Sequence, residues 1–326
     1  MLRKCLVAAC LALPLVWASP AAADVITFDP TATPGPAGDL SIDVLDPTVG
    51  NSIAIGGSAS LTPGQNVTVL YQANLGVATL GGNTVYAQGD NGTYFTIVAG
   101  FQETVLSTTG GPFPTLVFDV NETGTVFGAP NYFYIYENTT GSANNLTGNC
   151  FTCGTLVLAG TIVDPEAVPG TPNSTFTVTG GGAGTNLDQF NADNYPAIDT
   201  LTGLGSFTVT IQTYYADPLV FPNLVPGSTF VLATSQQVLP YTQVDPSACF
   251  YPTGTGTFAA CTQPGATLAS VGSINGQSGP NTMFQTDANL SFVVQQAVPE
   301  PASLTLLGLG LLGGVRSLRR KAQARS

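Results

Sequence analysis

The sequence has almost no positive charge, and the little it has lies at the two ends. Of its 326 residues, seven are Lys or Arg and none is His. Between Ala23 and Val298 there is no Lys, Arg or His, whereas every acidic residue except Glu300 lies in that interval. Binding to DNA or RNA depends on cationic side chains that neutralise phosphates. We therefore expect no nucleic-acid partner.

The missing cations also limit the catalytic chemistry of residues 24–297, which we call the body. Catalysis by Ser–His or Cys–His pairs needs a general base, and phosphoryl transfer needs Lys or Arg at the phosphates. We therefore predict that the protein is not an enzyme. The alternative is a carboxylate-dependent glycan hydrolase or lyase, which needs two carboxyl groups about 5 Å or about 6.5–9.5 Å apart. Four acids are available for that role: Glu103, Asp119, Glu122 and Glu137.

Charged residues of either sign are scarce, at 8% of the chain, whereas 44% of it is hydrophobic and it contains 38 Gly and 24 Pro. This composition is typical of many short strands joined by turns. Apolar and polar residues alternate most clearly in SFTVTIQTYY (206–215), where Phe207, Val209 and Ile211 are expected to face inward. Residues 24–297 are therefore predicted to form an all-β body, an antiparallel β-sandwich with a jelly-roll or lectin-like strand order.

The first 23 residues have the three parts of a secretory signal peptide. Arg3 and Lys4 precede an apolar stretch from Cys5 to Trp17, and residues 21–23 provide an Ala-x-Ala cleavage site. We expect signal peptidase to remove residues 1–23, so that the exported chain begins at Asp24.

Residues 298–326 combine three unlike elements in a fixed order. A Pro-rich motif (298–301) precedes an uncharged run at about 302–315 and a basic tail (316–326). The uncharged run covers about 21 Å as a helix, which is short for a hydrocarbon core of about 30 Å. We therefore predict a marginal, temporary membrane helix whose basic end stays in the cytoplasm. The motif consists of Val298, Pro299, Glu300 and Pro301, and the membrane stop of Arg316, Arg319, Arg320 and Lys321.

This ending resembles the PEP-CTERM sorting signal of Gram-negative bacteria. The resemblance implies that the chain is exported, held transiently in the inner membrane and processed by an exosortase near the motif. It also implies that the processed protein reaches the cell surface or the extracellular matrix of a bacterium that makes exopolysaccharide.

Several segments of the body resemble a narrower group, the flocculation-associated PEP-CTERM proteins. They include LYQANLG (70–76), NYFYIYEN (131–138), NLTGNCFTCGTLVLAGTI (145–162) and SINGQSGPNTMFQTDANLSF (273–292). The resemblance implies a structural or adhesive matrix protein that promotes flocculation or biofilm formation. We expect exposed Tyr, Asn and Thr side chains to bind exopolysaccharide, although alternating core aromatics explain YFYIY (132–136) equally well.

Four cysteines lie outside the signal peptide, in a compartment that favours disulfides. Cys150 and Cys153 form a CxxC motif, but a reactive CxxC thiolate needs a helix N-terminus or a nearby cation, and the body has no cation. We therefore predict structural disulfides. Cys249 and Cys261 are expected to close a loop, with a crossed pairing to Cys150 or Cys153 left open.

Calcium is the metal that this anionic body suits best, because carboxylate and amide oxygens are its natural ligands. DVNETG (119–124) begins like an EF-hand loop, but Pro130 stands where the closing Glu should be. The predicted calcium ligands lie instead in LDQFNADNYPAID (187–199), and they are Asp188, Asn191, Asp193, Asn194 and Asp199.

Overall fold

The structure is a computed structural model that describes residues 24–145, 148–165, 170–187, 195–238, 250 and 269–293. In these residues the fold is all-β with large antiparallel sheets, which confirms the predicted class. The strands are β1 (Ile26–Phe28), β2 (Leu40–Ile42), β3 (Val44–Pro47), β4 (Gly50–Ile55), β5 (Asn66–Leu80), β6 (Asn83–Ala87), β7 (Tyr94–Thr108), β8 (Thr115–Val120), β9 (Thr125–Val126), β10 (Ala129–Pro130), β11 (Tyr132–Asn138), β12 (Thr155–Val163), β13 (Ser174–Asn186), β14 (Asp199–Ala216), β15 (Thr229–Val238), β16 (Ile274–Asn275) and β17 (Asn281–Val293).

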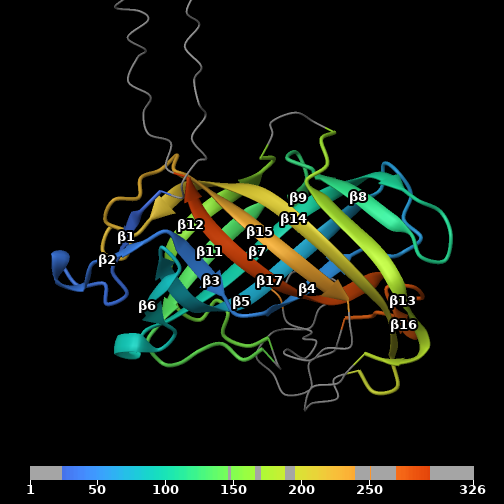
Figure 1. Ribbon diagram of the computed structural model, residues 1–326, viewed down its shortest axis with the longest axis horizontal. Helices are drawn as coiled ribbons and strands as arrows, with labels where there is room; N and C mark the ends of the chain where they lie inside the picture. Colours follow the sequence, from blue (N-terminus) through green and yellow to red (C-terminus); the bar gives the residue numbers. More distant parts are fainter. Residues whose placement is uncertain are drawn as a thin grey trace, which may run out of the picture.

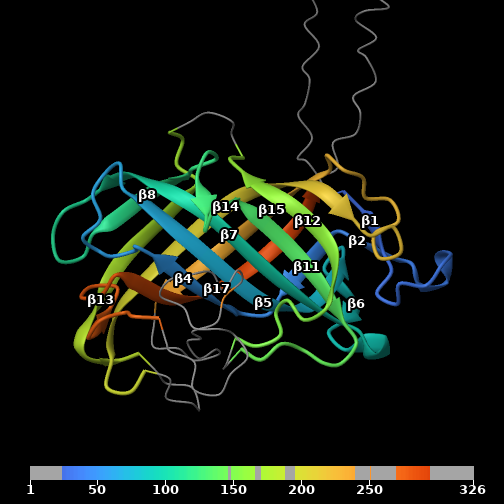
Figure 2. The ribbon, with the colours of Figure 1, turned by 180° about the vertical axis from the view of Figure 1, so that it is seen from behind.

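The main sheet closes on itself. Hydrogen-bonded neighbours run from β5 through β7, β11, β12, β14, β15, β17 and β4 back to β5. β8 and β13 form a second link between β7 and β14, beside β11 and β12. β14, β15 and β17 form the near wall in Figure 1, and β5, β7 and β11 form the near wall in Figure 2. The two walls thus face each other as in a sandwich.

The interior between the walls is filled by alternate residues of each strand, as the period of two requires. The prediction for β14 is confirmed, because Phe207, Val209 and Ile211 are buried in this core. Aromatic rings pack edge to face at one end, where the ring centroid of Phe28 lies 5.2 Å from that of Phe95. Each fully buried ring of this kind contributes about 1.5–3 kcal/mol to stability.

A second apolar cluster lies on the outer face of the wall that contains β4, β5 and β7, and it includes the first part of β17, which pairs with β4. It includes Ile53 of β4, Leu70 of β5, Val98 of β7 and Met283 of β17, all of them buried. Segments outside the sheet cover these side chains with Ala143, Phe151, Leu187, Tyr195, Phe250, Ala269 and Val271. This wall is therefore buried on both faces, which explains why VTVLYQA (67–73) has little polar alternation.

Helix is scarce in the described residues, where it consists of two short 3-10 turns, η1 (Pro36–Gly38) and η2 (Asp90–Gly92). None of the helices in these ranges is long and apolar enough to cross a membrane. The predicted signal peptide (1–23) and the predicted membrane helix (about 302–315) lie outside the described residues.

Candidate functional site

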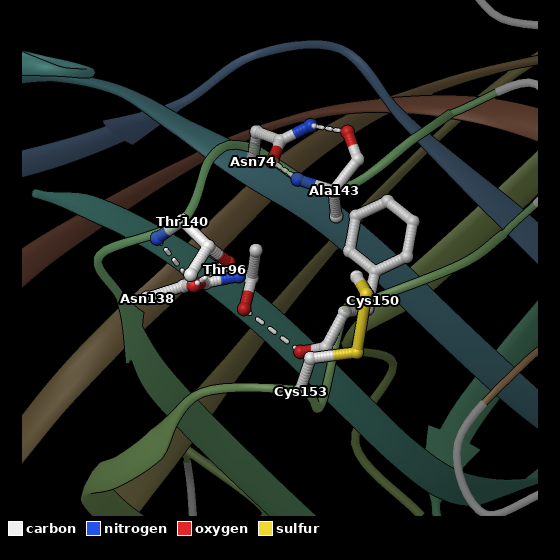
Figure 3. The surroundings of a disulfide bond; sticks show 8 residues. Asn74, Thr96, Asn138, Thr140, Ala143, Cys150 and Cys153 are labelled. Atoms are coloured by element: carbon white, nitrogen blue, oxygen red, sulfur yellow. Dashed lines mark hydrogen bonds between the residues drawn. A yellow bond between two sulfur atoms is a disulfide. The ribbon is translucent and has the colours of Figure 1, made fainter.

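The CxxC motif lies in the segment that connects β11 to β12, residues 139–154, of which 146 and 147 are not described. We call it the cover segment, because it lies on the outer face of the wall formed by β4, β5 and β7 (Figure 3). Cys150 and Cys153 form a disulfide within it. Cys249 and Cys261, which are predicted to pair with each other, lie outside the described residues, so their pairing stays a prediction.

Polar side chains of the sheet hold the cover segment in place. The Asn74 amide acts like a short strand, because its Nδ2 donates to the Ala143 carbonyl at 3.0 Å and its Oδ1 accepts from the Ala143 N–H at 2.9 Å (Figure 3). The Thr96 hydroxyl donates to the Phe151 carbonyl at 2.7 Å. These bonds satisfy backbone groups next to the disulfide. The surroundings of the CxxC motif are therefore those of a structural bridge.

The predicted calcium site is described at one residue. Asp199 begins β14, where its backbone N–H donates to the Ser273 carbonyl at 3.2 Å. Within the described ranges, no group of three or more His, Cys, Asp and Glu side chains is placed to hold a metal ion. The calcium site thus stays a prediction, and four of its ligands lie outside the described residues: Asp188, Asn191, Asp193 and Asn194.

The four acids considered for glycan hydrolysis do not gather on one face of the sheet. Glu103 and Glu137 belong to opposite ends of the sheet, because Glu137 pairs with Phe95, eight residues and about 27 Å from Glu103 along β7. Asp119 of β8 pairs with Thr104, the residue after Glu103, and therefore faces the opposite side of the sheet from Glu103. On that outer side its carboxylate accepts a hydrogen bond from the Gly170 N–H at 2.6 Å.

Glu122, the fourth of these acids, is exposed and accepts a hydrogen bond from the backbone N–H of Asp164 at 3.0 Å. Its carboxylate therefore ties two loops together. Because Glu103 faces inward while Asp119 faces outward, and Glu137 is distant, these three acids do not converge on one face of the sheet.

Tyrosines gather on the outer face of β11. Tyr132 and Tyr134 stack with ring centroids 5.0 Å apart, and Tyr134 meets Tyr136 edge to face at 6.3 Å. Tyr132 lies over Gly100 of β7, where an added Cβ would come within 2.5 Å of its ring. The three outward tyrosines therefore form a row along the strand, while the intervening residues of β11 face the core.

A fourth tyrosine extends this row across the sheet. Tyr214 of β14 is 53% exposed, and its hydroxyl donates to the Tyr134 hydroxyl at 3.4 Å. In the register of the sheet Ala159 of β12 lies between Tyr134 and Tyr215, so the only side chain between these two tyrosines is a methyl group. Tyr215 is itself 39% exposed. We call Tyr134, Tyr136, Tyr214 and Tyr215 the tyrosine surface, whereas Tyr132, only 3% exposed, belongs to the second apolar cluster.

The tyrosine surface offers flat apolar rings together with hydroxyl groups that donate and accept hydrogen bonds. Burial, and then the hydrogen bond to Tyr214, raise the pKa of Tyr134, so its hydroxyl stays protonated at physiological pH. Sugar rings present the matching pattern of C–H faces and hydroxyl edges. YFYIY was recognised from the sequence, but Tyr214 was not. A signal for Tyr214 was present in the sequence, because Tyr214 continues the series of outward-facing residues Thr208, Thr210 and Gln212.

Comparison with known proteins identifies the C-terminal end of the chain. Residues 297–321 match the family model described as the PEP-CTERM protein-sorting motif. This match contains the predicted motif (298–301) and the four basic residues of the membrane stop, all outside the described structure. No curated protein and no solved structure matches the chain. The chain is therefore a PEP-CTERM protein, exported and directed to an exosortase for processing at the membrane.

Proposed function

We propose that this protein is a structural, adhesive component of the extracellular polysaccharide matrix and that it promotes flocculation or biofilm formation. The observation on which the proposal rests is the tyrosine surface, where Tyr214 and Tyr215 are exposed beside the row on β11. Rings held by a closed sheet lose little conformational entropy when they bind a ligand. A rigid aromatic surface of this kind suits the repeated sugar rings of a polymer.

The charge of the body supports the same role. With acids but no cations between Ala23 and Val298, the body repels anionic polymer unless divalent cations screen or bridge the two. In this proposal glycan contacts at the tyrosine surface supply specificity, and divalent cations supply cohesion.

A binding experiment tests the tyrosine surface directly. The full-length chain is incubated with exopolysaccharide from the bacterium that produces the protein, and the polymer is sedimented. The fraction of the protein that sediments with the polymer is then measured. Tyr214→Ala is expected to weaken binding about tenfold, in line with the loss of one exposed ring from a small contact surface. Tyr214→Phe separates the ring from the hydroxyl. Phe113→Ala is the matched control, since Phe113 is 56% exposed in the loop between β7 and β8.

The same incubation distinguishes the binder from the alternative hydrolase or lyase. Release of reducing ends, or of unsaturated products, would favour the enzyme, whereas retention of intact polymer favours the matrix protein. If the polymer is neither cleaved nor retained, both the matrix role and the enzymatic alternative are contradicted. In the cell, deletion of the gene is expected to leave polysaccharide synthesis intact while the cells disperse, and normal flocs in the deletion strain would contradict a matrix role.

A further inference from the structure

A cavity lies between the two walls and is lined by residues of β13 and of the turn after β16. Figure 1 shows these two strands at one end of the sheet. It has a volume of about 70 Å³, which is room for roughly five water molecules. Most of its wall is apolar and comes from β5, β8, β13 and β17, with Val69, Phe118, Val178 and Phe284 among the lining residues. Its size and lining suit a small apolar molecule of about five heavy atoms.

One carboxyl group points into this cavity. Glu103 follows Phe101 on the inward face of β7, lines the cavity and is only 4% exposed. Its side chain makes a hydrogen bond with Ser174, but its Oε1 is buried and has no hydrogen-bond partner. A buried polar oxygen without a partner costs about 1–3 kcal/mol. The oxygen therefore marks a position where a bound molecule would gain a strong hydrogen bond.

The loop that connects β4 to β5 lines one side of the cavity. Leu61 of this loop packs into the interior core, and the Ala59 N–H donates to the Gly276 carbonyl at 2.9 Å, which joins the loop to the turn after β16. Gly57, Ser58, Ala59 and Gly276 are among the lining residues.

We propose that this cavity binds a small apolar molecule with a cationic, hydrogen-bond-donating head, of the size and class of a short primary alkylamine, and that the ammonium group lies against Glu103. The alkyl chain occupies the apolar wall formed by β5, β8, β13 and β17. The proposal goes beyond matrix adhesion and does not depend on it.

A cationic head is favoured because the body has no cation of its own to pair with Glu103. The other polar lining residues are uncharged, among them Ser174, Gln236 and Thr282. The one acid whose charge reaches Glu103 is Asp119, on the outer face of β8, and it adds negative potential. An ammonium group would satisfy Oε1 and neutralise this potential at once.

The test is calorimetric titration of the full-length chain, in non-ionic detergent, with n-butylamine and with the uncharged 1-butanol. We expect n-butylamine to bind at least tenfold more tightly than 1-butanol at pH 8. Glu103→Gln keeps the shape of the side chain and is expected to weaken n-butylamine at least tenfold, while the affinity for 1-butanol changes less than threefold. Ala54→Leu, which fills the cavity, is expected to weaken both ligands.

The pH dependence provides an independent readout. Burial raises the pKa of Glu103 to about 7, so the affinity of the wild-type chain for n-butylamine should rise about tenfold from pH 6 to pH 8 as Glu103 ionises. The affinity for 1-butanol should stay constant. Three results would overturn the proposal: no n-butylamine binding, equal binding by Glu103→Gln, or equal affinities for amine and alcohol at both pH values.

Discussion

The pKa values of two buried acids of this protein shift in opposite directions. Burial raises the pKa of Glu103 to about 7, and a single hydrogen bond to Ser174 only partly opposes it. Burial also acts to raise the pKa of Asp29, but hydrogen bonds from the backbone and hydroxyl groups of Thr31 and Thr33 outweigh it and lower that pKa. The number of donors around a carboxylate decides which effect is larger.

Glu103 makes the folded state less stable as the pH rises. Its folded pKa lies above the value of about 4.5 in the unfolded chain, so its contribution is fully present below pH 4.5 and is lost as the pH rises to about 7. Glu103→Gln should remove this loss and raise the free energy of unfolding at pH 8 by about 1–3 kcal/mol. Urea denaturation at pH 5 and pH 8 measures the difference.

The exposed Glu122→Gln is the matched control for this substitution, because the amide oxygen can still accept the hydrogen bond from Asp164. It should leave the difference between pH 5 and pH 8 unchanged. A Glu103→Gln protein with the same pH dependence as the wild type would show that Glu103 ionises freely in the folded state.

Asp29 should have the opposite effect on acid stability. Because its folded pKa is lowered, its contribution is present above the unfolded pKa of about 3.8 and is lost as the pH falls below it. Asp29→Ala leaves the donors of Thr31 and Thr33 without their acceptor, and should lower the free energy of unfolding at pH 7 by about 2–4 kcal/mol. Urea denaturation measures it, with the exposed Asp39→Ala as control. An unchanged midpoint for Asp29→Ala would contradict this account.

At the scale of elements, one wall of the sheet has two buried faces, and the cover segment contributes to the burial of the second. Its hydrogen bonds come from outward polar residues of three strands: Asn51 of β4, Asn74 of β5 and Thr96 of β7. In β5 and β7 these residues alternate with inward apolar ones, since Asn74 lies between Ala73 and Leu75, and Thr96 between Phe95 and Ile97. The polar residues on this face therefore form hydrogen bonds with the backbone of the cover segment, where exposed polar residues would bind water.

Asn74 is the residue on which the cover segment depends most. Asn74→Ala removes both hydrogen bonds to the buried Ala143 backbone and should cost about 2–4 kcal/mol. Hydrogen exchange of the Ala143 amide should become faster, while amides of β14 and β15 stay protected. Asn83→Ala, at an exposed turn, is the control. Unchanged exchange at Ala143 would show that other contacts hold the segment.

The disulfide should matter less than these hydrogen bonds. It closes a loop of sequence separation three between Cys150 and Cys153, so its constraint on the unfolded chain is worth about 2 kcal/mol at most. A chain with Cys150→Ser and Cys153→Ser is expected to fold, to lose no more than this and to bind polysaccharide as the wild type does. Loss of the folded sheet in thermal melts monitored by circular dichroism would contradict this prediction.

At the scale of the whole molecule, the closed sheet carries acids and no cations. With no Lys, Arg or His from Asp24 to Ala297, no side-chain salt bridge can form within the body, and its charges repel one another. Screening this repulsion favours the compact state.

Salt should therefore stabilise the protein. Raising NaCl from 20 to 300 mM is expected to raise the melting temperature by roughly 2–4 °C, the shift that corresponds to about 1 kcal/mol in a body of this size. Calorimetry with NaCl and KCl measures it, and equal shifts show that screening, not specific ion binding, is responsible. A lower melting temperature in salt would indicate stabilising ion pairs that this composition excludes.

Some properties follow from short stretches of sequence. The all-β class follows from alternation within single strands, as the inward Phe207, Val209 and Ile211 show, and the PEP-CTERM ending is recognised from its own residues. The missing cations follow from composition. Each of these depends on neighbours in the chain, so no tertiary structure is needed to see it.

Other properties depend on which strands pair, and only the tertiary structure decides them. Closure of the sheet between β4 and β17 brings together residues more than two hundred positions apart. Pairing of β12 with β11 and β14 places Tyr214 beside Tyr134, and the register of β7 with β8 turns Glu103 inward and Asp119 outward. Long-range pairing depends on the whole set of strands competing for partners, which is why no local pattern could predict it.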